Sequence, residues 1–249
     1  MDVEIVKRSL DARKKPQLFY VYMLDVTIPE KEERKLLKRC RSSQIQKVEP
    51  VKYVFPVKHY EGQKRPVIVG MGPAGLFCGY VLAKAGFRPI LLERGKCVEE
   101  RSRDVEAFWK TGHLNTESNV QFGEGGAGTF SDGKLTTGTG DVRIRKVLEE
   151  LVKAGAPEEI LYEAKPHVGT DKLPGTVKNI REQIRSLGGE VYFETLVSNF
   201  FFRDGKLEAL EVVGKDGKRK RLECSQAILA IGHSSRDTFE RLSLSLIHI

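Results

Sequence analysis

Six consecutive residues, Gly70-Met-Gly-Pro-Ala-Gly75, have the composition and spacing of a phosphate-binding turn. They follow the apolar run Val67–Val69 and open an apolar helical stretch, Leu76–Ala85. In such a unit Gly70 permits a tight turn, Gly72 lets a pyrophosphate approach the backbone, and Gly75 lets the helix pack close to the strand. The free N–H groups and partial positive charge of the helix N-terminus then face the pyrophosphate. The alternative is a structural glycine turn in an α/β domain that binds no nucleotide.

A glutamate ends the second strand of this βαβ pattern. Pro89–Leu92 is apolar, and Glu93 follows it at the distance where a carboxylate accepts hydrogen bonds from ribose hydroxyls. The same carboxylate repels a 2′-phosphate, which disfavours NADP at this position. Three features favour FAD over NAD: the Glu93-Arg94-Gly95 sequence, a long insertion in place of a third βαβ unit, and Ala227–Gly232. That last segment resembles the late strand of flavoproteins with two dinucleotide sites.

A second glycine-rich stretch, Asn119–Lys134, carries four glycines within six residues. Its glycines are expected to leave backbone N–H groups exposed for a ligand, with polar side chains beside them. Phe122 and Phe130 are expected to anchor it. The alternative is a flexible surface loop.

The expected elements follow from hydrophobic periodicity and from glycine and proline signals. Helices are predicted at 30–41, 76–85, 98–111, 141–154 and 176–187. Strands are predicted at 17–28, 67–69, 89–92, 190–195, 206–213 and 219–224, with an extended segment at 48–57 and a short buried strand at 227–231. Hairpin turns are expected at 203–205 and 216–217.

This order predicts an α/β protein whose Rossmann-type FAD-binding domain, residues 64–243, carries an insertion around 112–175. A small α+β domain, residues 1–63, precedes it. Residues 244–249 match the translation of a transposase end sequence used in DNA library preparation. They are therefore expected to be a non-native tail on an N-terminal fragment; the alternative is a genuine apolar C-terminal strand.

Composition bounds the class of protein. Hydrophobic residues make up 40% of the 249 residues and charged residues 31%, as in globular proteins. No apolar run is long enough for a membrane span, and the N-terminus has no signal-peptide pattern. The four cysteines are scattered, which argues against a zinc site or disulfide framework and favours a reducing cytoplasm. We therefore expect a cytoplasmic protein without a metal site or membrane association.

The formal net charge of +8 lies mostly in residues 1–65. One interpretation is an RNA-directed flavoprotein that uses this basic domain for binding. The other is a solvated basic face. Because no nucleic-acid motif accompanies the charge, a nucleic-acid partner is not expected.

The chain resembles the family of bacterial uncharacterised FAD-dependent dehydrogenases, often labelled NAD(FAD)-utilising dehydrogenases. The resemblance extends nearly to Ser243 and rests on five segments: 7–15, 69–75, 119–135, 166–171 and 229–238. It implies a protein about twice this length, with a small N-terminal α+β domain and an FAD domain split by a substrate-domain insertion. It also implies a C-terminal return to the FAD domain, with a Gly-Asp element, which this chain is expected to lack.

The predicted function is that of an FAD-dependent oxidoreductase, a dehydrogenase that transfers hydride to or from an unknown small-molecule substrate, with NAD(P)H a candidate electron donor. A non-catalytic flavin-binding protein is the third alternative. No catalytic residue is assigned; His167 and His233 are either hydrogen-bonding residues near a flavin or structural. The residues predicted to bind the cofactor are Gly70, Gly72, Pro73, Ala74, Gly75, Glu93, Arg94, Gly125, Gly126, Gly128, Thr129, Ser131, Asp132, Lys134, Val197, Ala230 and Gly232.

Overall fold

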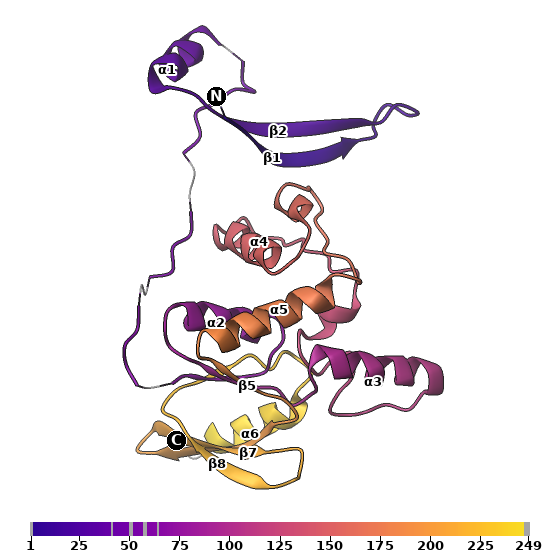
Figure 1. Cartoon of the computed structure of the whole chain (residues 1–249), viewed down its shortest axis with the longest axis vertical. Helices are drawn as coiled ribbons and strands as arrows, with labels where there is room; N and C mark the ends of the chain where they lie inside the picture. Colours follow the sequence, from indigo (N-terminus) through magenta and orange to yellow (C-terminus); the bar gives the residue numbers. More distant parts are fainter. Residues whose placement is uncertain (1, 41, 50–51, 57–58, 64, 247–249) are drawn as a thin grey trace. The chain divides into compact units, whose positions relative to one another are not determined.

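The computed structural model describes residues 2–40, 42–49, 52–56, 59–63 and 65–246. The chain divides into two compact units (Figure 1). The first comprises residues 1–54 and 134–168, and the second comprises residues 55–133 and 169–249. The segment 134–168, which belongs to the first unit, lies within the insertion predicted around 112–175.

The second unit is built on a four-stranded parallel sheet. Its strands are β3 (Val67–Val69), β4 (Ile90–Leu92), β5 (Glu190–Tyr192) and β9 (Ala227–Leu229), in the order β5-β4-β3-β9. Helix α2 (Pro73–Lys84) connects β3 to β4. The predicted α/β class with a Rossmann-type βαβ unit is therefore confirmed.

Two further layers enclose the faces of this sheet. Helices α2 and α5 (Leu173–Ser186) lie on one side of β5, and an antiparallel sheet lies on the other (Figure 1). That sheet consists of β6 (Leu196–Arg203), β7 (Lys206–Val213) and β8 (Arg219–Glu223). The two sheets meet in a buried cluster made of Val67, Val69, Leu92, Val197, Phe200, Leu210 and Cys224.

Three more elements complete the second unit. Helix α3 (Val98–Thr111) has the bounds that the sequence predicts and ends at Gly112, whose φ is 73°. A short 3-10 helix, η1 (Ala127–Phe130), follows in the glycine-rich stretch. Helix α6 (Arg236–Leu246) was not predicted, and it includes the first residues of the expected tail; residues 247–249 lie outside the described part of the chain.

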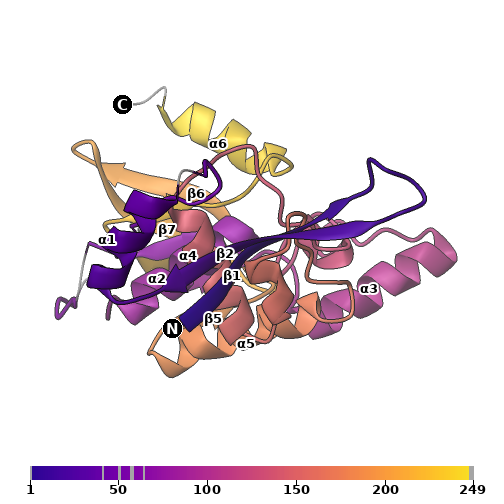
Figure 2. The same cartoon turned by 90° about the horizontal axis from the view of Figure 1, so that it is seen from above.

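The first unit contains a long antiparallel hairpin of β1 (Asp2–Asp11) and β2 (Phe19–Thr27), seen from above in Figure 2. Helix α1 (Glu30–Arg39), helix α4 (Arg143–Lys153) and the 3-10 helix η2 (Glu158–Leu161) belong to the same unit. Arg8 joins the hairpin to the two residues that follow η2, Tyr162 and Glu163. Its N–H donates to the Tyr162 carbonyl at 2.7 Å, and its guanidinium pairs with Glu163 between the rings of Tyr20 and Tyr162.

At several strands the structure differs from the sequence predictions. Strands β1 and β6 were not predicted, because their apolar alternation is interrupted by charged or polar residues and their pairing partners lie elsewhere in the chain. The strand predicted to be buried at 227–231 is shorter, and Ile228 and Leu229 are exposed, because β9 lies at the edge of the sheet. Of the extended segment at 48–57, residues 50–51 and 57 lie outside the described residues.

No helix within the described ranges is long and apolar enough to cross a membrane.

Candidate functional site

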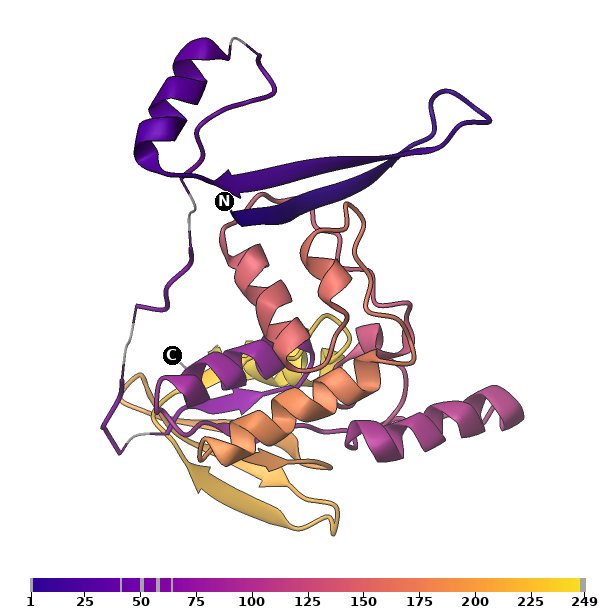
Figure 3. The ribbon, with the colours of Figure 1, turned by 45° about the horizontal axis from the view of Figure 1, so that its top comes forward.

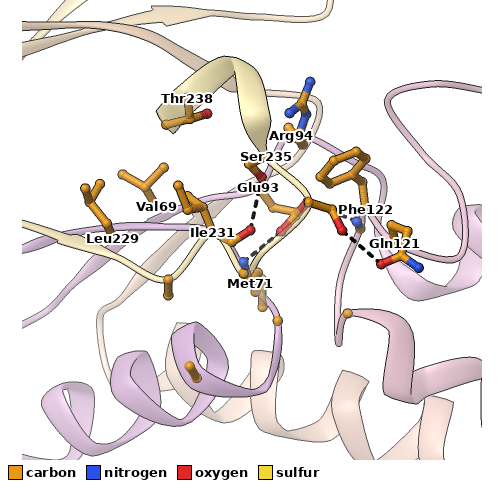
Figure 4. A pocket seen from close by; sticks show the side chains of 18 of the residues that line it. Val69, Met71, Glu93, Arg94, Gln121, Phe122, Leu229, Ile231, Ser235 and Thr238 are labelled. Carbon is orange, nitrogen blue, oxygen red and sulfur yellow. Dashed lines mark hydrogen bonds between the residues drawn. The ribbon is translucent and has the colours of Figure 1, made fainter. Parts of the chain in front are cut away.

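A cavity of about 560 Å³ opens at the carboxyl ends of β3, β4 and β9 (Figure 4). Helices α2 and α5 of the same unit lie side by side (Figure 3). Ligands of open α/β sheets bind at this end of the strands, where the following loops diverge. The cavity walls come from residues 69–74, 92–94, 121–123, 126–128, 195–197, 229–235 and Thr238. All of these segments belong to the second unit.

The geometry of the turn between β3 and α2 accounts for the glycines in its sequence. Gly70 has a φ of 95°, and its N–H donates to the Leu92 carbonyl at 2.8 Å. A Cβ on Gly75 would lie 1.9 Å from the Gly70 carbonyl oxygen, so only glycine permits this closeness. A Cβ on Gly72 would meet only the Gly126 Cα, at 4.0 Å, among the described atoms. Gly72 therefore faces the open cavity.

Glu93 ties the turn to the glycine-rich stretch. Its carboxylate is buried and accepts hydrogen bonds from the N–H groups of Met71 (2.7 Å), Gly95 (2.9 Å) and Gly123 (3.1 Å). The contact with Met71 is drawn in Figure 4. A carboxylate has about four acceptor positions, so three backbone bonds leave room for one more donor. The predicted bond to a ribose stays a prediction.

Arg94 lines the cavity, and its positive charge is paired with neighbouring carboxylates. Its guanidinium lies 4.4 Å from the centre of the Phe122 ring and donates to Glu117 at 2.9 Å and to Asp237 at 3.1 Å. Burial by itself would lower the pKa of Arg94, but the two carboxylates outweigh burial and raise it. The guanidinium is thus held in place by its neighbours within the protein.

The glycine-rich stretch packs directly against the glycine turn. The Gly125 N–H donates to the Met71 carbonyl at 2.8 Å, and a Cβ on Gly126 would lie 3.1 Å from the Pro73 Cδ. Gly126 has a φ of 64°, which favours glycine independently of this contact. The two motifs are at least 44 residues apart in sequence, yet they form one surface.

The structure brings most of the predicted cofactor residues together. Those that line the cavity are Gly70, Gly72, Pro73, Ala74, Glu93, Arg94, Gly126, Gly128, Val197, Ala230 and Gly232. Gly75, Gly125 and buried Thr129 instead support the two motifs from behind; the Thr129 hydroxyl donates to the Glu124 carbonyl at 3.4 Å.

Three predicted residues lie elsewhere. Ser131 and Asp132 are exposed and do not line the cavity, and Lys134 belongs to the first unit, where it pairs with His167 in a β-bridge. Their roles in cofactor binding stay predictions. Of the two histidines considered, only His233 lines the cavity.

Several lining residues were not predicted from sequence, among them Gln121, Ser234, Ser235 and Thr238. The Ser234 hydroxyl lies 3.3 Å from the Gln121 Oε1, so the loop after β9 meets the glycine-rich stretch across the cavity (Figure 4). In the sequence, these residues are marked only by their place within the segments 119–135 and 229–238.

Comparison with known proteins gives one family match and one close relative. Residues 1–27 match a family described as a domain of unknown function (DUF8436). An uncharacterised protein of Clostridium beijerinckii is 51% identical over 242 residues, which cover 96% of this chain and 44% of the relative. The chain therefore spans less than half the length of the curated relative that it matches.

Similar solved structures include THI4 from Thermovibrio ammonificans, with 17% identity and a TM-score of 0.46 over 73% of this chain and 62% of that one. Another is glycerol-3-phosphate dehydrogenase from Bacillus halodurans complexed with FAD, with 12% identity and a TM-score of 0.47 over 73% and 36% of the two chains. Because these similarities are distant, we infer the function of the site from its own residues.

Proposed function

We propose that this chain carries the FAD-binding part of an FAD-dependent oxidoreductase. The observation that carries the proposal is the cavity at the carboxyl ends of β3, β4 and β9, with Gly72 and the N-terminus of α2 on its floor. The N–H groups of the first helical turn have no acceptor within their own helix. They suit a pyrophosphate, which would lie beside Gly72 and Ala74.

Charges near Glu93 favour a nucleotide with a free 2′-hydroxyl. The Arg94 guanidinium pairs with two carboxylates, those of Glu117 and Asp237, and Glu93 is a third carboxylate at the cavity. A 2′-phosphate placed here would meet excess negative charge, whereas a ribose hydroxyl could donate to Glu93. The adenosine part of FAD satisfies this condition, and FMN has no adenosine.

A bound FAD would supply the electron transfer, and the protein would bind, orient and shield it. The turn at Gly72 would hold the pyrophosphate, and residues 195–197 and 229–232 would enclose the cofactor from the side of β6 and β9. A small-molecule substrate and NAD(P)H as electron donor are part of the same proposal. Turnover of a chemical electron acceptor with NAD(P)H, measured on the longer Clostridium relative, tests that part.

The cofactor site is tested with Gly72→Val. Gly72 has a φ of −67°, which valine adopts readily, and its Cβ would point into open space. The variant should fold normally and lose FAD affinity by about 100-fold or more, because the isopropyl group fills the place of the pyrophosphate. Fluorescence titration with FAD measures the affinity, and circular dichroism checks the fold.

Gly138→Val is the matched control, because a Cβ on Gly138 would meet no described atom within 4 Å and the residue lies in the first unit. It should bind FAD like the parent chain. Equal affinity of the parent and Gly72→Val would contradict the proposed site, as would a bound cofactor that chromatography identifies as FMN.

A further inference from the structure

A buried arginine of α3 holds the glycine-rich stretch from behind. Arg101 is fully buried, and its guanidinium donates to three backbone carbonyls: those of Asn119 (2.8 Å), Val120 (2.9 Å) and Glu124 (2.5 Å). The guanidinium also lies 4.7 Å from the centre of the Phe130 ring. Desolvation lowers the pKa of Arg101 to about 10, so the group keeps its charge at neutral pH.

The residues between these carbonyls face the cavity and the glycine turn. Gln121, Phe122 and Gly123 line the cavity, and the Gly123 N–H reaches Glu93. A Cβ on Gly123 would lie 2.3 Å from the Arg101 Cδ, so glycine at this position makes room for the arginine. The guanidinium therefore fixes the curve of the backbone that forms one wall of the site.

Glu124 anchors the same backbone from the side of α5. Its buried Oε2 accepts a hydrogen bond from the Val98 N–H at 2.8 Å and from Arg181 at 2.6 Å. Its Oε1 has no hydrogen-bond partner among the residues that the structure describes. Burial raises the pKa of Glu124, and the charge of Arg181 opposes that rise. Buried side chains of both signs, among them Arg101 and Glu124, thus support the six residues 119–124.

We infer that Arg101 is a positioning residue that holds residues 119–126 in their binding-competent conformation before the cofactor arrives. The inference rests on the proposed function, since the ordered wall serves FAD binding. Arginine suits this role because its planar group offers five donors in a fixed geometry, whereas a lysine offers one rotating ammonium. A preformed wall lowers the ordering entropy that ligand binding would otherwise cost.

The first measurement is amide hydrogen exchange of the cofactor-free chain, read by mass spectrometry. Arg101→Met should speed exchange in peptides covering 119–126 by about tenfold or more, as expected from losing one charge-assisted hydrogen bond. Peptides covering β3 and β4 should be unchanged. Arg101→Lys should give a smaller increase, and it provides a second variant if Arg101→Met does not fold.

Arg103→Met is the matched control, because Arg103 is an exposed residue of the same helix and its loss removes the same charge. It should leave exchange unchanged. Unchanged exchange at 119–126 in Arg101→Met would overturn the inference. An equal increase throughout the second unit would do the same, because it would indicate a general loss of stability.

The second measurement is FAD affinity, expected to fall about tenfold or more in Arg101→Met and less in Arg101→Lys. If the parent chain binds FAD and the Arg101→Met variant binds it equally well, the inference is refuted while the proposed function stands. A parent that binds no FAD would count against the proposed function, whereas the exchange measurement would still decide whether Arg101 orders the stretch.

Discussion

Two apolar strand segments of this protein differ sharply in burial. Residues 67–69 and 91–92 in the second unit are at most 6% exposed, whereas residues 19–24 of β2 are between 47% and 63% exposed. Both segments are continuous apolar runs of the kind that is typical of buried strands. In the second unit, helices cover one face of the strands and a second sheet covers the other. In the hairpin of the first unit, β1 is the one partner of β2 among the strands that the structure describes.

This difference shows that an apolar run predicts a strand, while burial depends on the layers around it. A two-stranded hairpin buries too little apolar surface to be stable by itself. Polar contacts join the hairpin to the rest of its unit, such as those of Arg8 with Glu163 and of Arg145 with Glu4. We therefore expect local opening to cost less free energy in the hairpin than in the parallel sheet.

The largest effect is expected where the second unit is packed most tightly. Gly75→Ala would place a Cβ 1.9 Å from the Gly70 carbonyl oxygen, so strand and helix must separate. We expect the free energy of unfolding to fall by about 4 kcal/mol or more. Gly175→Ala, in α5, is the control; a Cβ there would meet no described atom within 4 Å. Its stability should be equal or slightly higher, because alanine favours helix. Denaturant unfolding measures both, and equal stabilities would contradict the packing described.

The comparison between the two strand segments is tested by one chemical change made in each. Leu91 is fully buried and Leu24 is 48% exposed. Leu91→Ala should lower the free energy of unfolding by about 3 kcal/mol, because it removes transfer energy and leaves a cavity. Leu24→Ala should cost less than about 1 kcal/mol. Denaturant unfolding, with hydrogen exchange to assign each transition to its unit, measures these values. A larger loss in Leu24→Ala would show that β2 is covered.

The smallest effect concerns two acidic residues whose pKa values both lie at about 2. Hydrogen bonding to Arg181 lowers the pKa of Glu99, and hydrogen bonding to Arg13 lowers that of Asp11. A carboxyl group whose pKa is lower in the folded than in the unfolded state stabilises the fold at pH values above its unfolded pKa, about 4. This stabilisation is lost as the pH falls toward 2. Glu99→Gln should therefore flatten the acid branch of the stability curve. Asp11→Asn should change the acid branch less, because Arg13 is only two residues away in sequence and the Asp11–Arg13 pair can persist in the unfolded chain.

These curves are measured by denaturant unfolding between pH 2 and pH 7. A greater flattening in Asp11→Asn than in Glu99→Gln would show that the exposed pair in the first unit stabilises the fold more than the half-buried one in the second.

The sequence by itself determined the β3–α2–β4 unit and the place of its glycines. Gly70, Gly72 and Gly75 could be assigned because their roles follow from backbone sterics within one short segment. The bounds of α3 and β7 were likewise predictable, since local periodicity and turn residues specify them. Glu93 was found by its distance from the turn, although its three backbone partners were not.

Only the tertiary structure decided how distant segments meet. Strands β1 and β6 depend on pairing, and pairing partners leave no mark in the local pattern. Lys134 is a second example. Its neighbours in sequence suggested a place in the cofactor site, but it belongs to the first unit. Arg101 looks like any arginine of an amphipathic helix until the fold places three carbonyls around it. A buried charge is stable only when such partners are supplied, and in this protein the partners come from 18 or more residues further along the chain.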